Sequence, residues 1–171
     1  MPKQLAAILL LTLLLASCRE KKAEITYLNN ELTTINDSLF LKGQVWGEEF
    51  RIGFSTGDYS QLKSAREELQ EYIERSIKRI NTLQDVGGSE KFRKTEMEYL
   101  RFERDAIVAK MIPFESFDSN TTKEEITAAY NALMEASRQE QAHMEQLRAV
   151  QRDYAEKNDL KLERSSISGV D

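Results

Sequence analysis

The sequence predicts an all-α protein that folds as an up-down-up-down antiparallel four-helix bundle. Three observations lead to this prediction. Apolar residues recur every three or four positions in four segments, the loops at 56–59 and 86–89 are short, and turn-forming residues are few. The 171 residues include only 2 Pro and 7 Gly against 40% apolar residues, which disfavours an all-β fold with its many turns.

The first apolar stripe predicts a helix at about 25–55. Its members share one helical face: Ile25, Leu28, Leu32, Ile35, Leu39, Trp46 and Phe50. Gly43 and Gly47 lower the helix propensity, so we expect a kink near them. A three-helix bundle with this segment partly detached is the alternative, but it would leave Trp46 and Phe50 exposed, which argues for four helices.

Two further stripes predict helices at about 59–85 and 89–112. The first comprises Leu62, Ala65, Leu69, Tyr72, Ile73, Ile77, Ile80 and Leu83, and the second comprises Phe92, Thr95, Tyr99, Phe102, Ala106 and Ala109. Gly87 and Gly88 separate them, and Pro113 ends the third helix. In the linker that follows, we expect Phe114 and Phe117 to fold back over one end of the core.

The fourth helix is predicted at about 122–160. Thr122 and Glu125 have the spacing of a capping box at its start. Its stripe contains Ile126, Ala129, Tyr130, Leu133, Ala136, Glu140, His143, Met144, Leu147, Val150 and Tyr154. The bundle therefore covers 25–164, and residues 165–171 are predicted to be a frayed tail.

Charge and composition exclude several classes of function. The chain has 24 Lys and Arg against 29 Asp and Glu, for a net charge of −5. An acidic chain with dispersed bases is not expected to bind nucleic acid, because such binding requires cations that neutralise phosphates. The single Cys excludes an internal disulfide, and the single His excludes a His-rich metal site.

The N-terminal 17 residues are typical of a secretory signal peptide. Lys3 precedes an aliphatic stretch of about 12 residues, which is too short to span a bilayer. The run Leu15-Ala16-Ser17-Cys18 resembles a bacterial lipobox. That resemblance implies cleavage between Ser17 and Cys18 and a covalent lipid, diacylglyceryl with a further acyl chain such as palmitate, on Cys18. No other cofactor is expected.

The lipobox resemblance also predicts where the protein resides. Residues 18–24 are expected to form a short charged tether that holds the bundle near a membrane. Arg19, rather than Asp, follows Cys18, which favours the outer membrane, on its periplasmic face or on the cell surface. The alternatives are an ordinary signal peptide in which Cys18 falls by chance, or an uncleaved anchor.

Glu140 and His143 form the one motif with the geometry of a metal site. In di-iron bundles, Glu-x-x-His on a helix directs both side chains inward. Such a centre needs two of these motifs, and this chain has one His. A site with one metal ion, built from Glu140, His143 and carboxylates such as Glu31, Glu68, Glu96 or Glu103, stays open. The alternatives are a polar layer that sets helix register, or a position at the edge of the stripe where both side chains reach water.

No motif indicates an enzyme. No Ser lies in a Gly-x-Ser-x-Gly context, which disfavours a serine hydrolase. Gly87-Gly88 lacks the Lys and the preceding strand of a phosphate-binding loop. With 29 acidic residues, pairs of carboxylates arise by chance and do not indicate glycoside chemistry.

Several short motifs resemble an uncharacterised family of helical-bundle surface lipoproteins from Bacteroidota and spirochaetes. These motifs are the lipobox, the turn Gly57-Asp58-Tyr59, Pro113-Phe114, and the pattern Gln-x-x-Tyr-Ala-x-Lys-x-x-Leu at 151–160. The resemblance implies a lipid anchor and a four-helix fold. It implies no established activity.

Two functions follow as expectations. The leading one is a membrane-anchored, non-catalytic lipoprotein whose bundle binds a protein or envelope partner. The alternative is a lipoprotein that binds a ligand or metal ion in the bundle core near Glu140 and His143.

Overall fold

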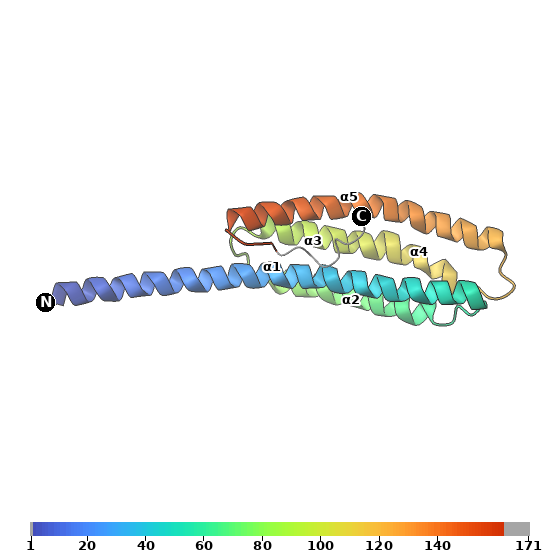
Figure 1. Cartoon of the computed structure of the whole chain (residues 1–171), viewed down its shortest axis with the longest axis horizontal. Helices are drawn as coiled ribbons and strands as arrows, with labels where there is room; N and C mark the ends of the chain where they lie inside the picture. The colour runs from blue at the N-terminus through green and yellow to red at the C-terminus, as the bar shows by residue number, and fades with distance from the viewer. Residues whose placement is uncertain (1, 163–171) are drawn as a thin grey trace.

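The structure, a computed structural model, describes the backbone of residues 2–162 and the side chains of residues 20–162. The described residues form an antiparallel four-helix bundle (Figure 1), which confirms the predicted fold class. The elements are α1 (Pro2–Thr56), α2 (Leu62–Thr82), α3 (Glu90–Phe102), the π-helix η1 (Glu103–Val108), α4 (Ala109–Met111), the 3-10 helix η2 (Ile112–Ser116) and α5 (Lys123–Lys157). The segments from α3 to η2 follow one another directly and make up the third rod of the bundle.

The helices pack in the order in which they follow along the chain. α1 packs against α2, α2 against the third rod, and the third rod against α5. Figure 1 shows α1 projecting beyond the rest of the bundle at its N-terminal end. The third rod therefore lies between α2 and α5.

α1 differs from the expectation in length. Residues 18–24, expected to be a tether, belong to the continuous helix, and α1 passes through Gly43 and Gly47 without interruption. The physical reason is local: Arg, Glu, Lys and Ala at 19–24 are all good helix formers. The expected frayed tail, 165–171, lies outside the described residues.

The predicted apolar stripes of α1 and α2 face the core. Six of the seven predicted α1 residues are buried, and Phe50 is partly buried against them. Leu62, Leu69, Ile73 and Ile80 of α2 are also buried. The spacing of three and four residues therefore identified the inward faces of these two helices correctly.

The third rod departs from the predicted stripe after Phe102. The expectation that Ala109 faces the core is wrong, because Ala109 is exposed. Ala106 is half-buried, and Ile107, Val108 and Met111 are buried. The π-helical turn at Glu103–Val108 explains the difference, because hydrogen bonds to the fifth residue rather than the fourth shift the helical face.

Aromatic side chains close the end of the bundle near the α1–α2 loop. Phe114, fully buried, meets Trp46 edge to face with ring centroids 5.5 Å apart, and meets Phe50 in the same way at 5.0 Å. Phe117 packs edge to face against Tyr59 at 5.8 Å. The prediction that Phe114 and Phe117 fold over the core is confirmed.

The start of α5 also follows its sequence signal. The Thr122 hydroxyl accepts a hydrogen bond from the Glu125 backbone N–H, and the Glu125 carboxylate accepts one from the Thr122 N–H at 2.9 Å. This is the predicted capping box, which satisfies N–H groups that the first turn leaves free.

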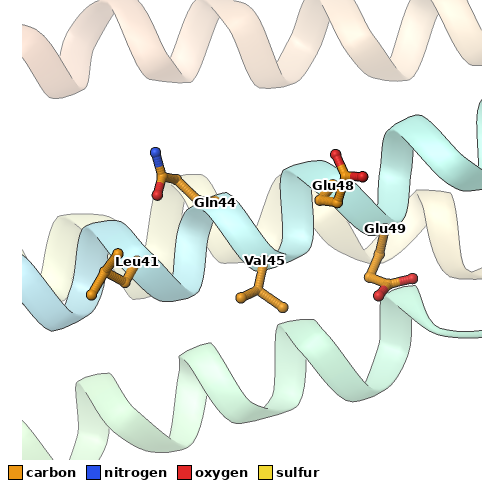
Figure 2. Close-up of a pocket in the computed structure, with 5 residues that line it drawn as sticks. All are labelled: Leu41, Gln44, Val45, Glu48 and Glu49. Atoms are coloured by element: carbon orange, nitrogen blue, oxygen red, sulfur yellow. The ribbon is translucent and has the colours of Figure 1, made fainter.

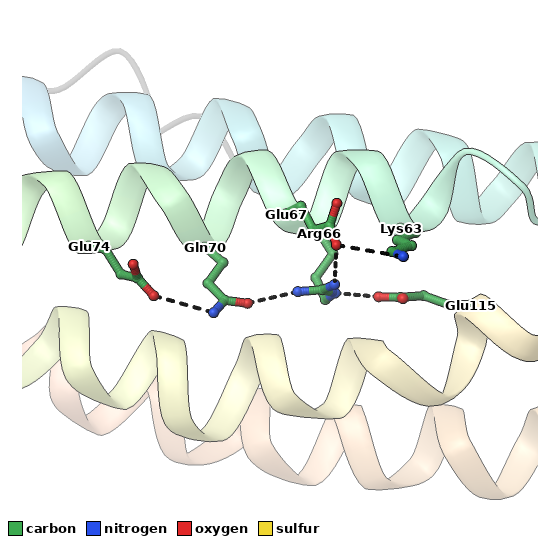
Figure 3. A network of polar contacts seen from close by, with 6 residues as sticks. All are labelled: Lys63, Arg66, Glu67, Gln70, Glu74 and Glu115. Carbon is green, nitrogen blue, oxygen red and sulfur yellow. Dashed lines mark hydrogen bonds and ion pairs between the residues drawn. The ribbon is translucent and has the colours of Figure 1, made fainter.

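A polar network ties η2 to α2 (Figure 3). The Arg66 guanidinium pairs with Glu115 of η2 and donates to Gln70 at 2.7 Å. Gln70 in turn donates to Glu74 at 3.3 Å. The Arg66 and Glu115 side chains are only 10% and 16% exposed, so neither charge is well solvated without the other.

We expect the substitution Arg66→Ala to lower the free energy of unfolding by about 3 kcal/mol, because Glu115 would remain buried without its partner. Urea denaturation measures the loss. The matched control is Arg75→Ala in the same helix, whose pair with Glu71 is 63% and 69% exposed. This control should cost less than about 1 kcal/mol, and equal losses for the two variants would contradict the assigned role of Arg66.

Candidate functional site

The predicted site residues fall in two separate places. Ser17 and Cys18, the predicted cleavage and lipidation residues, belong to the part of α1 whose side chains lie outside the described residues. Glu140 and His143 lie in the middle of α5, where the side chains are described. The structure therefore bears on the Glu140 and His143 site only.

Glu140 is half-buried and faces the third rod. It accepts a hydrogen bond from the Tyr99 hydroxyl at 3.3 Å and another from the Ser137 hydroxyl at 3.4 Å. Glu103 of η1 lies close enough to form a side-chain hydrogen bond with Glu140. The predicted inward position of Glu140 is thus confirmed, and its neighbours are a phenol and a second carboxyl group.

His143 has a different environment. Its ring stacks on Phe102 with centroids 4.2 Å apart and an interplanar angle of 29°, so the imidazole is held by an aromatic contact. Across the side chains at 20–162, no three His, Cys, Asp or Glu residues converge as they would around a metal ion.

Glu96 is the most deeply buried acid of the cluster. Its side chain has no solvent exposure, and its Oε2 accepts a hydrogen bond from the Asn36 amide nitrogen at 3.0 Å. Burial raises the pKa of Glu96 to about 8, although the hydrogen bond from Asn36 opposes the rise. Burial has this effect because removal from water disfavours the charged form.

Glu103 is also buried, at 5% exposure. Its pKa lies well above the usual range, first because of burial and then because of the charge of Glu140 and a hydrogen bond with it. A hydrogen bond with Tyr99 partly offsets the rise. Burial, together with the charges of Glu103 and Glu140, also raises the pKa of Tyr99, so this phenol stays protonated and remains a donor.

We call Asn36, Glu96, Tyr99, Glu103 and Glu140 the acidic interior. Three of its buried oxygens have no hydrogen-bond partner among the described residues: Asn36 Oδ1, Glu96 Oε1 and Glu103 Oε1. All three are acceptors when the carboxyl groups are ionised. A buried acceptor without a donor costs about 1–3 kcal/mol. Protonation of a carboxyl group, or another group that donates hydrogen bonds, would remove this cost.

The sequence contains a signal for these acids that the apolar stripes do not reveal. Phe92, Glu96, Tyr99 and Glu103 follow one another at steps of four, three and four residues, which places them on one helical face. The other two acids considered with Glu140 lie elsewhere. Glu31 pairs with Arg79 at 2.8 Å and Glu68 with Lys42 at 3.7 Å, and both pairs bridge α1 and α2.

The outward face of α1 carries a second feature. A shallow, open hollow there is lined by Leu41, Gln44, Val45, Glu48 and Glu49 (Figure 2). Leu41 and Val45 are 59% and 53% exposed, and Ile52, on the same helical face, is 39% exposed. α1 therefore presents a short apolar stripe to solvent as well as one to the core.

Comparisons with known proteins give no family to which the chain can be assigned. No protein-family model, no curated protein and no solved structure matches it. Among the described residues, no helix is long and apolar enough to cross a membrane.

We expect Tyr99→Phe to lower the free energy of unfolding by about 1–2 kcal/mol, because Glu140 loses a buried donor while the packing of the ring is kept. Denaturation at a fixed pH near neutrality tests this. Tyr27→Phe is the control, since Tyr27 is 51% exposed and its substitution should cost less than about 0.5 kcal/mol. A loss no larger for Tyr99 than for Tyr27 would contradict this role.

Proposed function

We propose that this chain is a bacterial lipoprotein whose helical bundle is a non-catalytic interaction module at the outer membrane. The observation that carries the proposal is the position of its single Cys. Cys18 follows an apolar segment and the small residues Ala16 and Ser17, as lipidation requires. Two or three acyl chains bind a membrane stably, whereas one chain binds only marginally.

The length of the connection supports a location close to the lipid surface. Residues 19–24 belong to α1, and six helical residues span about 9 Å. A bundle anchored through Cys18 would therefore lie near the membrane, together with any partner that it contacts.

The exposed stripe of α1 supports the interaction role. Leu41, Val45 and Ile52 lie on one helical face and are all exposed. Apolar side chains grouped on one exposed face are typical of surfaces that bind another protein. Glu48 and Glu49 border the hollow beside them, so we infer a partner whose apolar face carries polar or basic residues at its edge.

We expect Cys18→Ser to abolish incorporation of a radioactive or alkyne-labelled palmitate and to release the protein from the membrane fraction. Ser17→Ala is the matched control, because it keeps a small residue before the cleavage site and should retain the label. Labelling of the Cys18→Ser protein would contradict lipidation at this position.

We expect a photo-crosslinking amino acid placed at Val45 to give a discrete crosslinked product in intact cells. The same amino acid at Gln139, an exposed position on α5, is the control and should give none. Val45 products should also decline in the Cys18→Ser background, because a released bundle leaves the membrane surface. Equal crosslinking from Val45 and Gln139 would contradict the assignment of α1 as the binding face.

A further inference from the structure

The acidic interior is not used by the proposed interaction role, and its hydrogen bonds are incomplete if every carboxyl group is ionised. The three oxygens without a partner among the described residues, Asn36 Oδ1, Glu96 Oε1 and Glu103 Oε1, belong to two neighbouring pairs. One pair is Asn36 with Glu96, and the other is Glu103 with Glu140. Each pair therefore contains at least one buried acceptor to which no described residue donates.

One proton completes the first pair. The Asn36 amide already donates to Glu96 Oε2 at 3.0 Å, which leaves Asn36 Oδ1 and Glu96 Oε1 without partners among the described residues. A protonated carboxyl group has one O–H donor. An O–H on Glu96 Oε1 can therefore donate to Asn36 Oδ1, giving a reciprocal acid–amide pair in which both of these oxygens are satisfied.

A second proton completes the other pair. Glu140 already accepts from Tyr99 and Ser137, so it is equipped to carry the negative charge. Glu103 Oε1 is buried, and no described residue donates to it. A proton on Glu103 can be donated to the Glu140 carboxylate, which removes one of two like charges from the interior.

The groups around the two pairs provide few other charges. α1 contributes Asn36, and α2 contributes Tyr72, whose hydroxyl donates to the Ile35 carbonyl oxygen. The third rod contributes Glu96, Tyr99 and Glu103; its Arg104 pairs with Asp105 at 2.7 Å and 37% exposure. α5 contributes Ser137, Glu140 and His143, which stacks on Phe102.

Along the bundle, the two pairs lie between two contacts that join α1 to α5. On one side of them, Gln151 of α5 donates to Thr33 of α1 at 3.0 Å. On the other side, Tyr130 of α5 stacks on Phe50 of α1 with centroids 6.3 Å apart. Between these contacts, Cβ atoms added at Gly43 and Gly47 would meet no atom within 4 Å, so larger side chains could be accommodated at these two positions of α1.

We propose that two shared protons, one in the Asn36–Glu96 pair and one in the Glu103–Glu140 pair, hold α1 and α5 to the third rod, and that their release to water in mildly alkaline conditions loosens these contacts. The paired groups lie on four different elements, so each proton joins two helices. The raised pKa values of Glu96 and Glu103 agree with protonation near neutrality.

Infrared spectroscopy of the full-length protein tests for the protons directly, because protonated and ionised carboxyl groups absorb at different frequencies. Near neutral pH we expect a protonated-carboxyl band. Glu96→Gln should remove one part of it and Glu103→Gln another, while the control Glu98→Gln, an exposed position in the same helix, should leave it unchanged. Absence of the band in the folded wild type, or its loss in Glu98→Gln, would overturn the proposal.

The pH dependence of unfolding supplies a test that needs no variant. The folded-state pKa of Glu96 is about 8 against an ordinary 4.5, so the folded state binds more protons between these values. The stability that the Glu96 proton contributes is therefore fully present below pH 4.5, decreases as pH rises above that value, and is lost once pH has passed about 8. For each such proton, the folding equilibrium constant should fall about tenfold per pH unit.

The same pH window distinguishes shared protons from a bound cation. A free energy of unfolding that does not change between pH 4.5 and about 8 would overturn the proposal. So would disappearance of the protonated-carboxyl band when Mg²⁺ or Mn²⁺ is added at neutral pH, since a cation would then be the natural occupant. Lower amide protection factors in the middle of α1 and α5, each corrected for the intrinsic exchange rate at that pH, would support loosening once the band is titrated away, and unchanged protection factors would refute it.

Discussion

The removal of two carboxyl groups from water is the constraint on which the centre of this bundle depends. Glu96 and Glu103 are nearly inaccessible to solvent. Burial of an isolated, ionised carboxylate is strongly unfavourable, because the charge loses its hydration. Their neighbours make the burial tolerable. Asn36 and Tyr99 donate hydrogen bonds to the cluster, and Glu140 is supplied with donors of its own.

The π-helical turn allows the third rod to present both acids and apolar residues to the core. Glu103 opens this turn, and Ile107 and Val108 at its end are buried. A regular α-helix would have continued the predicted face toward Ala109, which is exposed. π-helical turns are rare and occur frequently at functional sites, which agrees with the position of Glu103 in the acidic interior.

The proposed lipid anchor and the acidic interior lie in different parts of the fold, but both include residues of α1. α1 carries Cys18 near its beginning, the exposed Leu41 and Val45 farther along, and Asn36 between them. A change in how firmly α1 is held to the third rod would alter the platform that presents the exposed stripe. The acidic interior and the exposed stripe proposed to bind a partner are thus carried in part by one helix.

The sequence by itself determined the all-α class, the inward faces of α1 and α2, and the capping box of α5. These features rest on local spacing and on helix propensity, which neighbouring residues along the chain determine. It also pointed to Glu140 as inward-facing. Only the tertiary structure decided that Glu96 and Glu103 are buried beside it, that the face of the third rod shifts at its π-helical turn, and that His143 stacks on Phe102. Those outcomes depend on which side chains of other helices pack against each residue. The spacing of residues within one segment does not specify such contacts between helices.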